Sequence, residues 1–305
     1  MKIIECIPNF SEGRDSGIIT AIADAAATVA GVRILDFSMD CDHNRSVLTF
    51  IGPPETVLNG AIAACGRAAE LIDMRGHVGI HPRIGAVDVV PFVPLEDAQM
   101  ADAIEIAHRF GRVFAREHDV PVYFYGEAAL SRERKRLAEI RRGQYETLGD
   151  RMDDPAWRPD ISPDQSGFNP RLGATAVGAR KPLIAFNINL DSNDIGLARE
   201  IARSIRHSSG GLRHVQALGM LLGSRNIAQV SMNLTDYEVT SIRAVFDTVH
   251  KQAAQKGVDI LESELIGLIP RAALEGIPLD QIKLLDFCEE RIIENHCRVP
   301  ISERK

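Results

Sequence analysis

The chain has 305 residues, 45% of them hydrophobic and 25% charged, which is ordinary globular usage and excludes disordered, collagen-like and coiled-coil classes. This length suggests two domains, or one large domain built from two similar halves. The formal net charge of −7 provides no overall attraction for nucleic acid or an anionic membrane, so we expect neither as a partner. An anionic ligand would therefore need a local basic pocket.

The cysteines and the N-terminus favour a cytoplasmic protein. The five cysteines are odd in number and form no C-x-x-C pair, which favours reduced thiols. The first apolar run is interrupted at Glu5 and Pro8, too early for a secretory signal. No apolar run approaches the roughly 20 residues of a membrane-spanning helix.

Hydrophobic periodicity, with proline and glycine as breakers, predicts the elements of the first part of the chain. The expected order is a strand at 3–7, a helix at 16–29, strands at 32–37 and 46–51, a helix at 53–72, a strand at 87–92, a helix at 95–117, a strand at 120–125 and a charged helix at 127–142. The segment 143–179 is rich in proline and glycine and lacks periodicity, which indicates a functional loop or a linker.

The second part repeats this order. The expected elements are a strand at 183–188, a helix at 194–205, strands at 215–222 and 227–234 joined by a hairpin turn at 223–226, a helix at 238–255, a strand at 265–269 and a helix at 279–295. Each part opens with β-α-β-β-α-β, the order of a ferredoxin-like unit. We therefore predict an α+β fold made of two ferredoxin-like halves.

His81 is the strongest candidate for proton transfer. Pro82 disfavours a helical conformation at His81, and Gly79 and Gly85 free the backbone on either side. An imidazole can accept and release a proton near neutrality. Arg83 could hold a carboxylate, and Asp88, or an acidic residue from elsewhere, could orient the ring. A surface or capping histidine is the alternative.

A metal site is the rival use of the same segment. His77 and His81 have i, i+4 spacing, and further donors are available at Asp36, Asp40, Asp42 and His43. This spacing needs a helix to converge, and Gly79 and Pro82 argue against one. The glutamate of the metalloprotease pattern is also missing. We therefore expect no metal.

Two further segments are polar or basic. The segment 40–45 presents Asp40, Asn44 and Arg45 between two expected strands, although asparagine and aspartate are also ordinary turn formers. The segment 168–181 combines small residues with Arg171 and Arg180, which could neutralise an anion. It lacks the G-K-[ST] of a phosphate-binding loop, and a solvated linker has the same composition.

Several motifs resemble those of the glutamate formimidoyltransferases. They are CIPNFSEG at 6–13, HPR at 81–83 followed by GAVDVVPF at 85–92, VYFYGEAA at 122–129, GAT at 173–175 with GARK at 178–181, AFNINL at 185–190 and QVSMNL at 229–234. They occur in the family's order over most of the chain, so coincidence is improbable.

The resemblance implies transfer of a formimino group from N-formimino-L-glutamate to N5 of tetrahydrofolate, with the folate as co-substrate and without a metal. It implies two halves with facing sheets around a folate tunnel, a homodimer, His81 as the catalytic residue, and contact of the loop from about Ser162 to Gly173 with the folate. With the element order, this places the subdomains at 1–179 and 180–305. The candidate substrate-binding residues of this loop and its end are Ser162, Phe168, Gly173, Ala174 and Thr175; those from the polar segment are Asp40, Asn44 and Arg45, and Arg83, Arg171 and Arg180 could bind substrate carboxylates. Arg213 is a further candidate for binding a carboxylate.

Some alternatives remain open at this point. A relative could exchange a formyl group in the same site, a folate-binding protein could lack catalysis, and a metal-dependent amidohydrolase would use the histidines differently. The chain ends at Lys305, so we expect no cyclodeaminase domain of the kind that vertebrate members of the family carry. The folate loop is about two residues longer around 164–167 than the resemblance implies, which leaves its individual contacts open.

Overall fold

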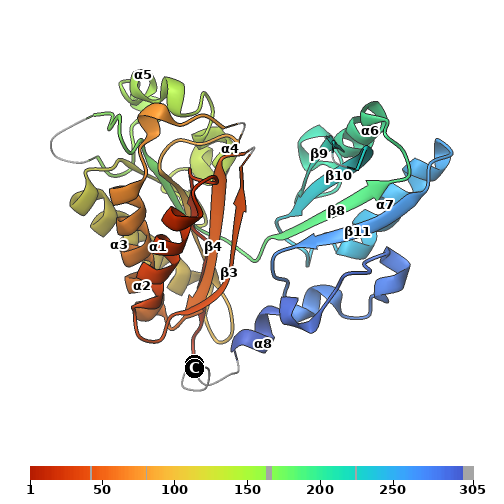
Figure 1. The fold of residues 1–305 in the computed structure, drawn as a ribbon, viewed down its shortest axis with the longest axis horizontal. Helices are drawn as coiled ribbons and strands as arrows, with labels where there is room; N and C mark the ends of the chain where they lie inside the picture. Colours follow the sequence, from red (N-terminus) through yellow and green to blue (C-terminus); the bar gives the residue numbers. More distant parts are fainter. Residues whose placement is uncertain (42, 80, 163–166, 224, 298–305) are drawn as a thin grey trace. The chain divides into compact units, whose positions relative to one another are not determined.

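The computed structural model describes residues 1–41, 43–79, 81–162, 167–223 and 225–297. The chain forms two compact units, of which the first comprises Met1–Arg180 and the second begins at Lys181. Figure 1 shows both as mixed α+β units, each built on its own sheet.

The first unit contains a seven-stranded sheet. Its strands are β1 (Ile4–Cys6), β2 (Asn9–Phe10), β3 (Arg33–Asp40), β4 (Arg45–Gly52), β5 (Val87–Pro94), β6 (Val122–Gly126) and β7 (Thr175–Ala179). β1 and β2 both lie between β4 and β5 and are antiparallel to them. β3 pairs with β4, while β7 lies parallel between β5 and β6.

Three helices cover one face of this sheet (Figure 1). They are α1 (Ser16–Ala27), α2 (Pro54–Leu71) and α3 (Met100–His118). α1 begins where Asp15 accepts hydrogen bonds from the first-turn amides, and α2 begins with a proline in its first turn, as helix starts commonly do. Their apolar sides pack on strand residues such as Phe50 and Phe92 in the main core.

A smaller apolar cluster lies on the alternate residues of β5, β7 and β6. Val89, Ala176 and Tyr125 belong to it, packed with Ile140 and Leu148 from the segment after β6. Because successive strand residues point to opposite faces, this cluster covers the face that the three helices leave. The segment after β6 is thereby fixed beside the start of β5.

The expectation of a helix at 127–142 is wrong. Only η2 (Arg132–Lys135) and α4 (Leu137–Ile140) form there. The charged side chains that suggested a solvated helix instead form tertiary ion pairs, Arg134 with Asp160 and Arg141 with Asp88. Tertiary contacts thus override the local helix propensity.

The expectation of an irregular segment at 143–179 is also wrong in part. It contains η3 (Tyr145–Thr147), α5 (Leu148–Met152), η4 (Pro155–Trp157) and the strand β7. Every residue of β7 is buried, so the strand has no polar alternation to reveal it. A Cβ on Gly178 would lie 2.5 Å from the Tyr125 ring, which explains why glycine occupies this position of β7.

The second unit has the expected order β-α-β-β-α-β. Its elements are β8 (Ile184–Leu190), α6 (Ile195–Ile205), β9 (Val215–Leu222), β10 (Ile227–Leu234), α7 (Ile242–Gln255) and β11 (Ile260–Ile266). The sheet order is β11-β8-β10-β9 with every pair antiparallel. The predicted hairpin between β9 and β10 is confirmed; Ser224 in its turn lies outside the described residues. Both helices pack on one core with residues such as Phe186 and Ile188.

The end of the second unit differs from expectation. The strand predicted at 265–269 lies earlier, at β11, and stops before Gly267, whose φ is 74°. The helix predicted at 279–295 is replaced by η7 (Leu279–Ile282), η8 (Glu289–Arg291) and α8 (Ile293–Cys297). Lys283 has a φ of 50°, in the left-handed region that a helix cannot continue through. The remaining short turns are η1 (Met74–Gly76), η5 (His207–Ser209) and η6 (Arg271–Leu274).

The helices and the cysteines were also compared with expectation. None of the helices in the described part of the chain is both long and apolar enough to cross a membrane. The five cysteines are all free thiols.

Candidate functional site

Three loops of the first unit meet beside β2, β4 and β5. They are residues 11–15, residues 41, 43 and 44 of the turn between β3 and β4, and residues 77–79 and 81–86 before β5. A Cβ on Gly13 would lie 2.2 Å from the carbonyl O of Asp40, and one on Gly79 would lie 2.4 Å from the carbonyl O of His43. Glycine at these two positions therefore permits the loops to touch.

Asn44 joins the three loops. Its φ is 49°, a conformation that asparagine tolerates better than most residues. Its Oδ1 accepts a hydrogen bond from the amide N of Gly13 at 3.0 Å, and its Nδ2 donates to the carbonyl O of Val78 at 3.0 Å. Asn44 is 6% exposed, and its two hydrogen bonds hold the turn against the other two loops.

His81 is half-buried in the segment before β5, a loop position as predicted. Nη1 of Arg45 lies 2.7 Å from Nε2 of the His81 ring. A guanidinium can only donate, so Nε2 is the acceptor and the neutral ring carries its proton on Nδ1. Burial, then the charges of Arg45 and Arg141, and then His43 lower the pKa of His81 to about 3. The ring is therefore a neutral imidazole at physiological pH.

Asp88 is not the group that holds the His81 ring. Its Oδ1 accepts from the amide N of Ile84 at 2.8 Å, and its Oδ2 forms an ion pair with Arg141. Asp88 is 2% exposed. The suggestion that Asp88 orients the imidazole is thus corrected: Asp88 fixes Arg141, and Arg45 contacts the ring.

Arg45 and Arg141 each carry a buried donor without an acceptor. Nε of Arg45 and Nε of Arg141 have no hydrogen-bond partner among the described residues. Burial and the positive charge of Arg141 lower the pKa of Arg45. Arg45 therefore contacts His81 with one of its donors unpaired, and Arg141 is near enough for its charge to lower the pKa of both Arg45 and His81.

Arg83 is saturated by contacts within the protein. Its Nη atoms donate to the Glu146 carboxylate at 2.6 and 3.0 Å, and its Nε donates to Nδ1 of His77 at 3.1 Å. Its side chain is only 6% exposed. The hydrogen bond from Arg83 lowers the pKa of Glu146. Sequence reasoning missed Glu146, because nothing in the local pattern links it to a residue 63 positions away.

The predicted folate-loop residues are distributed between surface and core. Ser162 is exposed, and Phe168 packs on Tyr145 with ring centroids 5.4 Å apart. Nη2 of Arg171 donates to the carbonyl O of Glu70 at 2.6 Å. Residues 163–166 of this loop lie outside the described residues.

The G-A-T end of the loop is buried against the His81 segment. Gly173 forms a bridge with Gly85, and the amide N of Ala174 donates to the carbonyl O of Ile84 at 2.9 Å. Thr175 is 1% exposed. Arg180 lies past the other end of β7, where its amide N donates to the carbonyl O of Phe92. Among the described residues, the structure thus brings 40–41, 43–45, 77–79, 81–88 and 171–175 together, with Arg180 at the opposite end of β7.

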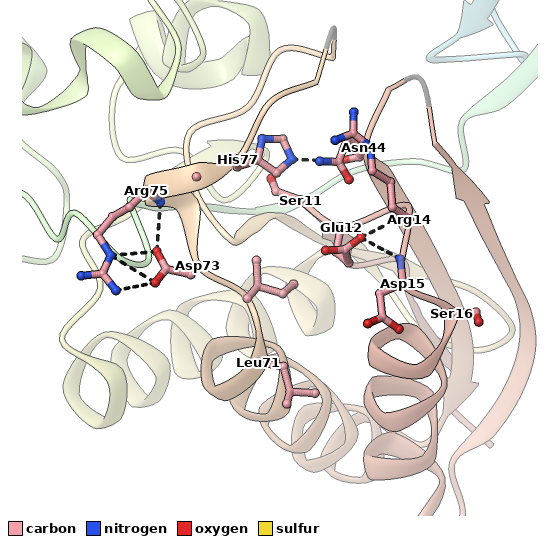
Figure 2. A pocket seen from close by; sticks show the side chains of 12 residues that line it. Ser11, Glu12, Arg14, Asp15, Ser16, Asn44, Leu71, Asp73, Arg75 and His77 are labelled. Carbon is pink, nitrogen blue, oxygen red and sulfur yellow. Dashed lines mark hydrogen bonds and ion pairs between the residues drawn. The ribbon is translucent and has the colours of Figure 1, made fainter.

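An open polar hollow of about 950 Å³ lies beside these loops. Its wall includes Ser11 and Glu12 from the N-terminal motif, together with Arg14, Arg75 and His77. Figure 2 shows Glu12 and Arg14 near the start of α1, with Asp73 and Arg75 on the other side. The Arg75 contacts lower the pKa of Asp73 to about 2, so that carboxylate stays ionised. Sequence reasoning missed Glu12, Asp73 and Arg75.

His77 and His81, the two histidines of the rival metal interpretation, have different hydrogen-bond partners. His77 follows η1 in an extended conformation, and its Nε2 donates to the carbonyl O of Asn44 at 3.0 Å. Within the described ranges, no group of three or more His, Cys, Asp or Glu side chains could hold a metal ion.

Comparison with known proteins identifies the family. A model of the N-terminal subdomain of the formiminotransferase domain matches residues 3–180, and a model of the formiminotransferase domain matches residues 185–282. The chain is 41% identical over 296 residues to a glutamate formimidoyltransferase of Streptococcus pyogenes serotype M1, covering 97% of this chain and 98% of that protein. It is 43% identical over 296 residues to a glutamate formimidoyltransferase of Thermoplasma acidophilum, covering 96% and 97%.

A longer relative matches through only part of its length. The formimidoyltransferase-cyclodeaminase of Rattus norvegicus is 43% identical over 279 residues, which cover 90% of this chain and 51% of that protein. The two domain models together span most of the residues from 3 to 282. The chain therefore belongs to the formiminotransferase family, and the predicted resemblance is confirmed.

Proposed function

We propose that this chain is a glutamate formimidoyltransferase. It transfers a formimino group from N-formimino-L-glutamate to N5 of tetrahydrofolate, which gives 5-formiminotetrahydrofolate and L-glutamate. The observation that carries the proposal is the match to glutamate formimidoyltransferases at 41% and 43% identity over nearly the full length of both proteins. The neutral His81 imidazole in the site loops supports it.

His81 moves the proton in the proposed reaction. N5 of tetrahydrofolate attacks the formimino carbon and forms a tetrahedral adduct, in which the N5 proton must leave and the departing glutamate nitrogen must gain one. A neutral imidazole accepts the first proton and returns it to the leaving nitrogen. Holding the two substrates in line supplies much of the remaining acceleration.

The loop contacts suggest how the predicted binding residues divide their roles. Asp40, Arg45 and Arg171 are proposed to face the substrates, with the exposed Ser162 and the half-buried Phe168 in the folate loop. Asn44 is proposed to act through the turn that it holds, because its amide is taken by Gly13 and Val78. Arg83 is proposed as a positioning residue, because its donors are taken by Glu146 and His77. Gly173, Ala174 and Thr175 are buried and are proposed to anchor the folate loop. Arg180 remains a candidate for a folate carboxylate.

The strand order of the two sheets supports the expected architecture. The order β11-β8-β10-β9, and the sequence β3, β4, β1, β5 across the first sheet, support two ferredoxin-like halves. We propose a functional boundary near residue 180, a folate tunnel bounded by facing sheets, a homodimer and a cytoplasmic location. Size measurement in solution tests the dimer directly.

One assay tests the proposed function. Purified protein is incubated with tetrahydrofolate and either N-formimino-L-glutamate or N-formyl-L-glutamate, and L-glutamate release is followed with the folate spectrum. We expect turnover with the formimino donor. Turnover with only the formyl donor would assign the chain to formyl transfer, while folate binding without turnover on either donor would assign it to a non-catalytic binding protein.

A further inference from the structure

The contact between Arg45 and His81 occupies the nitrogen that a proton-transfer step needs. Nη1 of Arg45 donates to Nε2 of His81 at 2.7 Å, and this lone pair is the only basic site on a neutral imidazole. The base of the proposed reaction is therefore masked by an arginine.

A carboxylate would be a better partner for Arg45 than the imidazole is. A carboxylate carries a charge opposite to that of the guanidinium and can accept two parallel N–H···O bonds from it, whereas a neutral imidazole offers one acceptor nitrogen and no charge. Arg45 and Arg141 also carry buried Nε donors that have no acceptor within the described part of the chain. An unpaired buried donor is destabilising. An anion that accepted hydrogen bonds from these Nε donors would remove that cost.

The other arginines near this site are already engaged. Arg83 is held by Glu146, and Nη2 of Arg171 donates to the carbonyl O of Glu70. Arg141 keeps its ion pair with Asp88, a carboxylate that is 2% exposed. That pair offsets one of the two positive charges and leaves the Arg45 charge for an incoming anion.

The chemistry of the donor identifies which anion this is. The nitrogen that leaves the tetrahedral adduct is bonded to Cα of glutamate, and Cα also carries the α-carboxylate. A histidine that protonates this nitrogen must therefore lie within a few bonds of the α-carboxylate. Folate carries its own carboxylates at the far end of the molecule from N5, so they do not reach the same place.

We propose that Arg45 and Arg141 form a cradle for the α-carboxylate of the donor, and that binding of this carboxylate draws Arg45 away from His81 and frees Nε2 to accept the proton. This inference rests on the proposed function and deepens it. It makes Arg45 a switch between the imidazole and the substrate, and it assigns a specificity role to Arg141. Nε2 of His81 would thus become available as a base only when the formimino donor is bound.

The charges around His81 set the direction of the expected titration. Burial, followed by the charges of Arg45, Arg141 and His43, lowers the pKa of His81. Asp88 and Asp40 raise the pKa of Arg45. A bound carboxylate adds a negative charge and removes the Arg45 contact, and both effects favour the imidazolium. The pKa of His81 should therefore rise when N-acetyl-L-glutamate is bound, because this analogue keeps the α-carboxylate and its amide nitrogen carries no charge.

The first test is an NMR titration of the full chain labelled in its histidine rings, with His81→Asn assigning the resonance. We expect the pKa of His81 to be higher with saturating N-acetyl-L-glutamate than without it. An unchanged His81 pKa with N-acetyl-L-glutamate bound would overturn the inference. This measurement needs no turnover, so it is separate from the test of the proposed function.

The second test compares adjacent arginines. Arg141→Gln should raise the KM for the formimino donor about 10- to 100-fold, the range expected for losing a hydrogen bond to a charged group, with the KM for tetrahydrofolate unchanged. Arg142→Gln is the matched control, because Arg142 is exposed and pairs only with Glu139 among the described residues. Equal donor KM values in the two variants would contradict the cradle.

Two refinements keep this test decisive. If Arg141→Gln fails to fold, Arg141→Lys replaces it. This variant retains a positive charge for Asp88, so it should fold. It lacks the Nε–H group, so it should bind N-formimino-L-glutamate only weakly. A formimino donor that lacks the α-carboxylate, N-formimino-4-aminobutyrate, should react equally with the wild type and with Arg141→Lys. If Arg141→Lys turned over this analogue more slowly than the wild type does, Arg141 would act on something other than the α-carboxylate.

Discussion

Nε of Arg83 donates to Nδ1 of His77 at 3.1 Å, and Nε2 of the same ring donates to the carbonyl O of Asn44 at 3.0 Å. The neutral His77 ring therefore transmits the position of Arg83 to the turn that carries Arg45. Because the Arg83 side chain is 6% exposed, a change at this position should disturb the site without removing a group that faces it.

Arg83→Lys should preserve the charge and lose this geometry. A lysine cannot bind Glu146 with two parallel donors while also contacting His77. We expect the free energy of unfolding to fall by about 1–3 kcal/mol and kcat to fall more than either KM rises. Arg243→Lys is the control, since Arg243 forms an exposed i, i+4 pair with Asp247. Equal losses of stability in the two variants would contradict the bridging role.

Gly13→Ala should separate two of the site loops. The new Cβ would lie 2.2 Å from the carbonyl O of Asp40 and 2.4 Å from the amide N of Arg45, so backbone must move. We expect a loss of about 1–3 kcal/mol in unfolding free energy and a fall in transfer rate, because Arg45 is displaced. A Cβ on Gly223 meets nothing within 4 Å, and Gly223→Ala should match the wild type. Wild-type turnover by Gly13→Ala would show that the loop contact is dispensable.

Glu5 gives a pH-dependent stability with a defined sign. Glu5 in β1 is 3% exposed, and burial, opposed by Arg180, raises its pKa from 4.5 to about 7. Between pH 4.5 and 7 the folded chain holds a proton that the unfolded chain has lost, so stability falls as pH rises through this window. Glu5→Gln should be as stable as the wild type at pH 5 and more stable by up to about 3 kcal/mol at pH 8.

Denaturant unfolding at the two pH values measures this effect. The lowered pKa of His81 adds stability as pH rises from about 3 to 6.5. This contribution is the same in Glu5→Gln and in the wild type, so the difference between their unfolding free energies cancels it. Glu105→Gln is the control, since Glu105 is exposed on α3. If Glu5→Gln gains no stability at pH 8 relative to pH 5, the carboxyl of Glu5 is ionised in the folded chain without cost.

Local sequence rules predicted the parts of the site that depend on backbone conformation. Pro82 and Gly79 placed His81 in a non-helical loop, and the polar segment 40–45 formed the turn between β3 and β4. The core strands and the helices α1, α2 and α6 were recognised because their apolar residues repeat with a clear period. The motifs carried the family assignment.

The rest depended on contacts between distant residues. Arg141 and Glu146 reach the site from a segment whose charges suggested a solvated helix, and their partners Asp88 and Arg83 lie 53 and 63 positions away. β7 was missed because it is buried on both faces and made of small residues. A single sequence carries no trace of such pairings, so the masking of His81 by Arg45 appears only in three dimensions.

The central claim is that His81 moves the proton between tetrahydrofolate and the departing glutamate nitrogen. Its most direct test is the rate of formimino transfer by His81→Asn under saturating substrates, with tetrahydrofolate affinity measured separately and His250→Asn, an exposed position on α7, as control. The account predicts a fall of about 10²- to 10⁴-fold in kcat with folate affinity retained. Turnover of His81→Asn at the wild-type rate would contradict it.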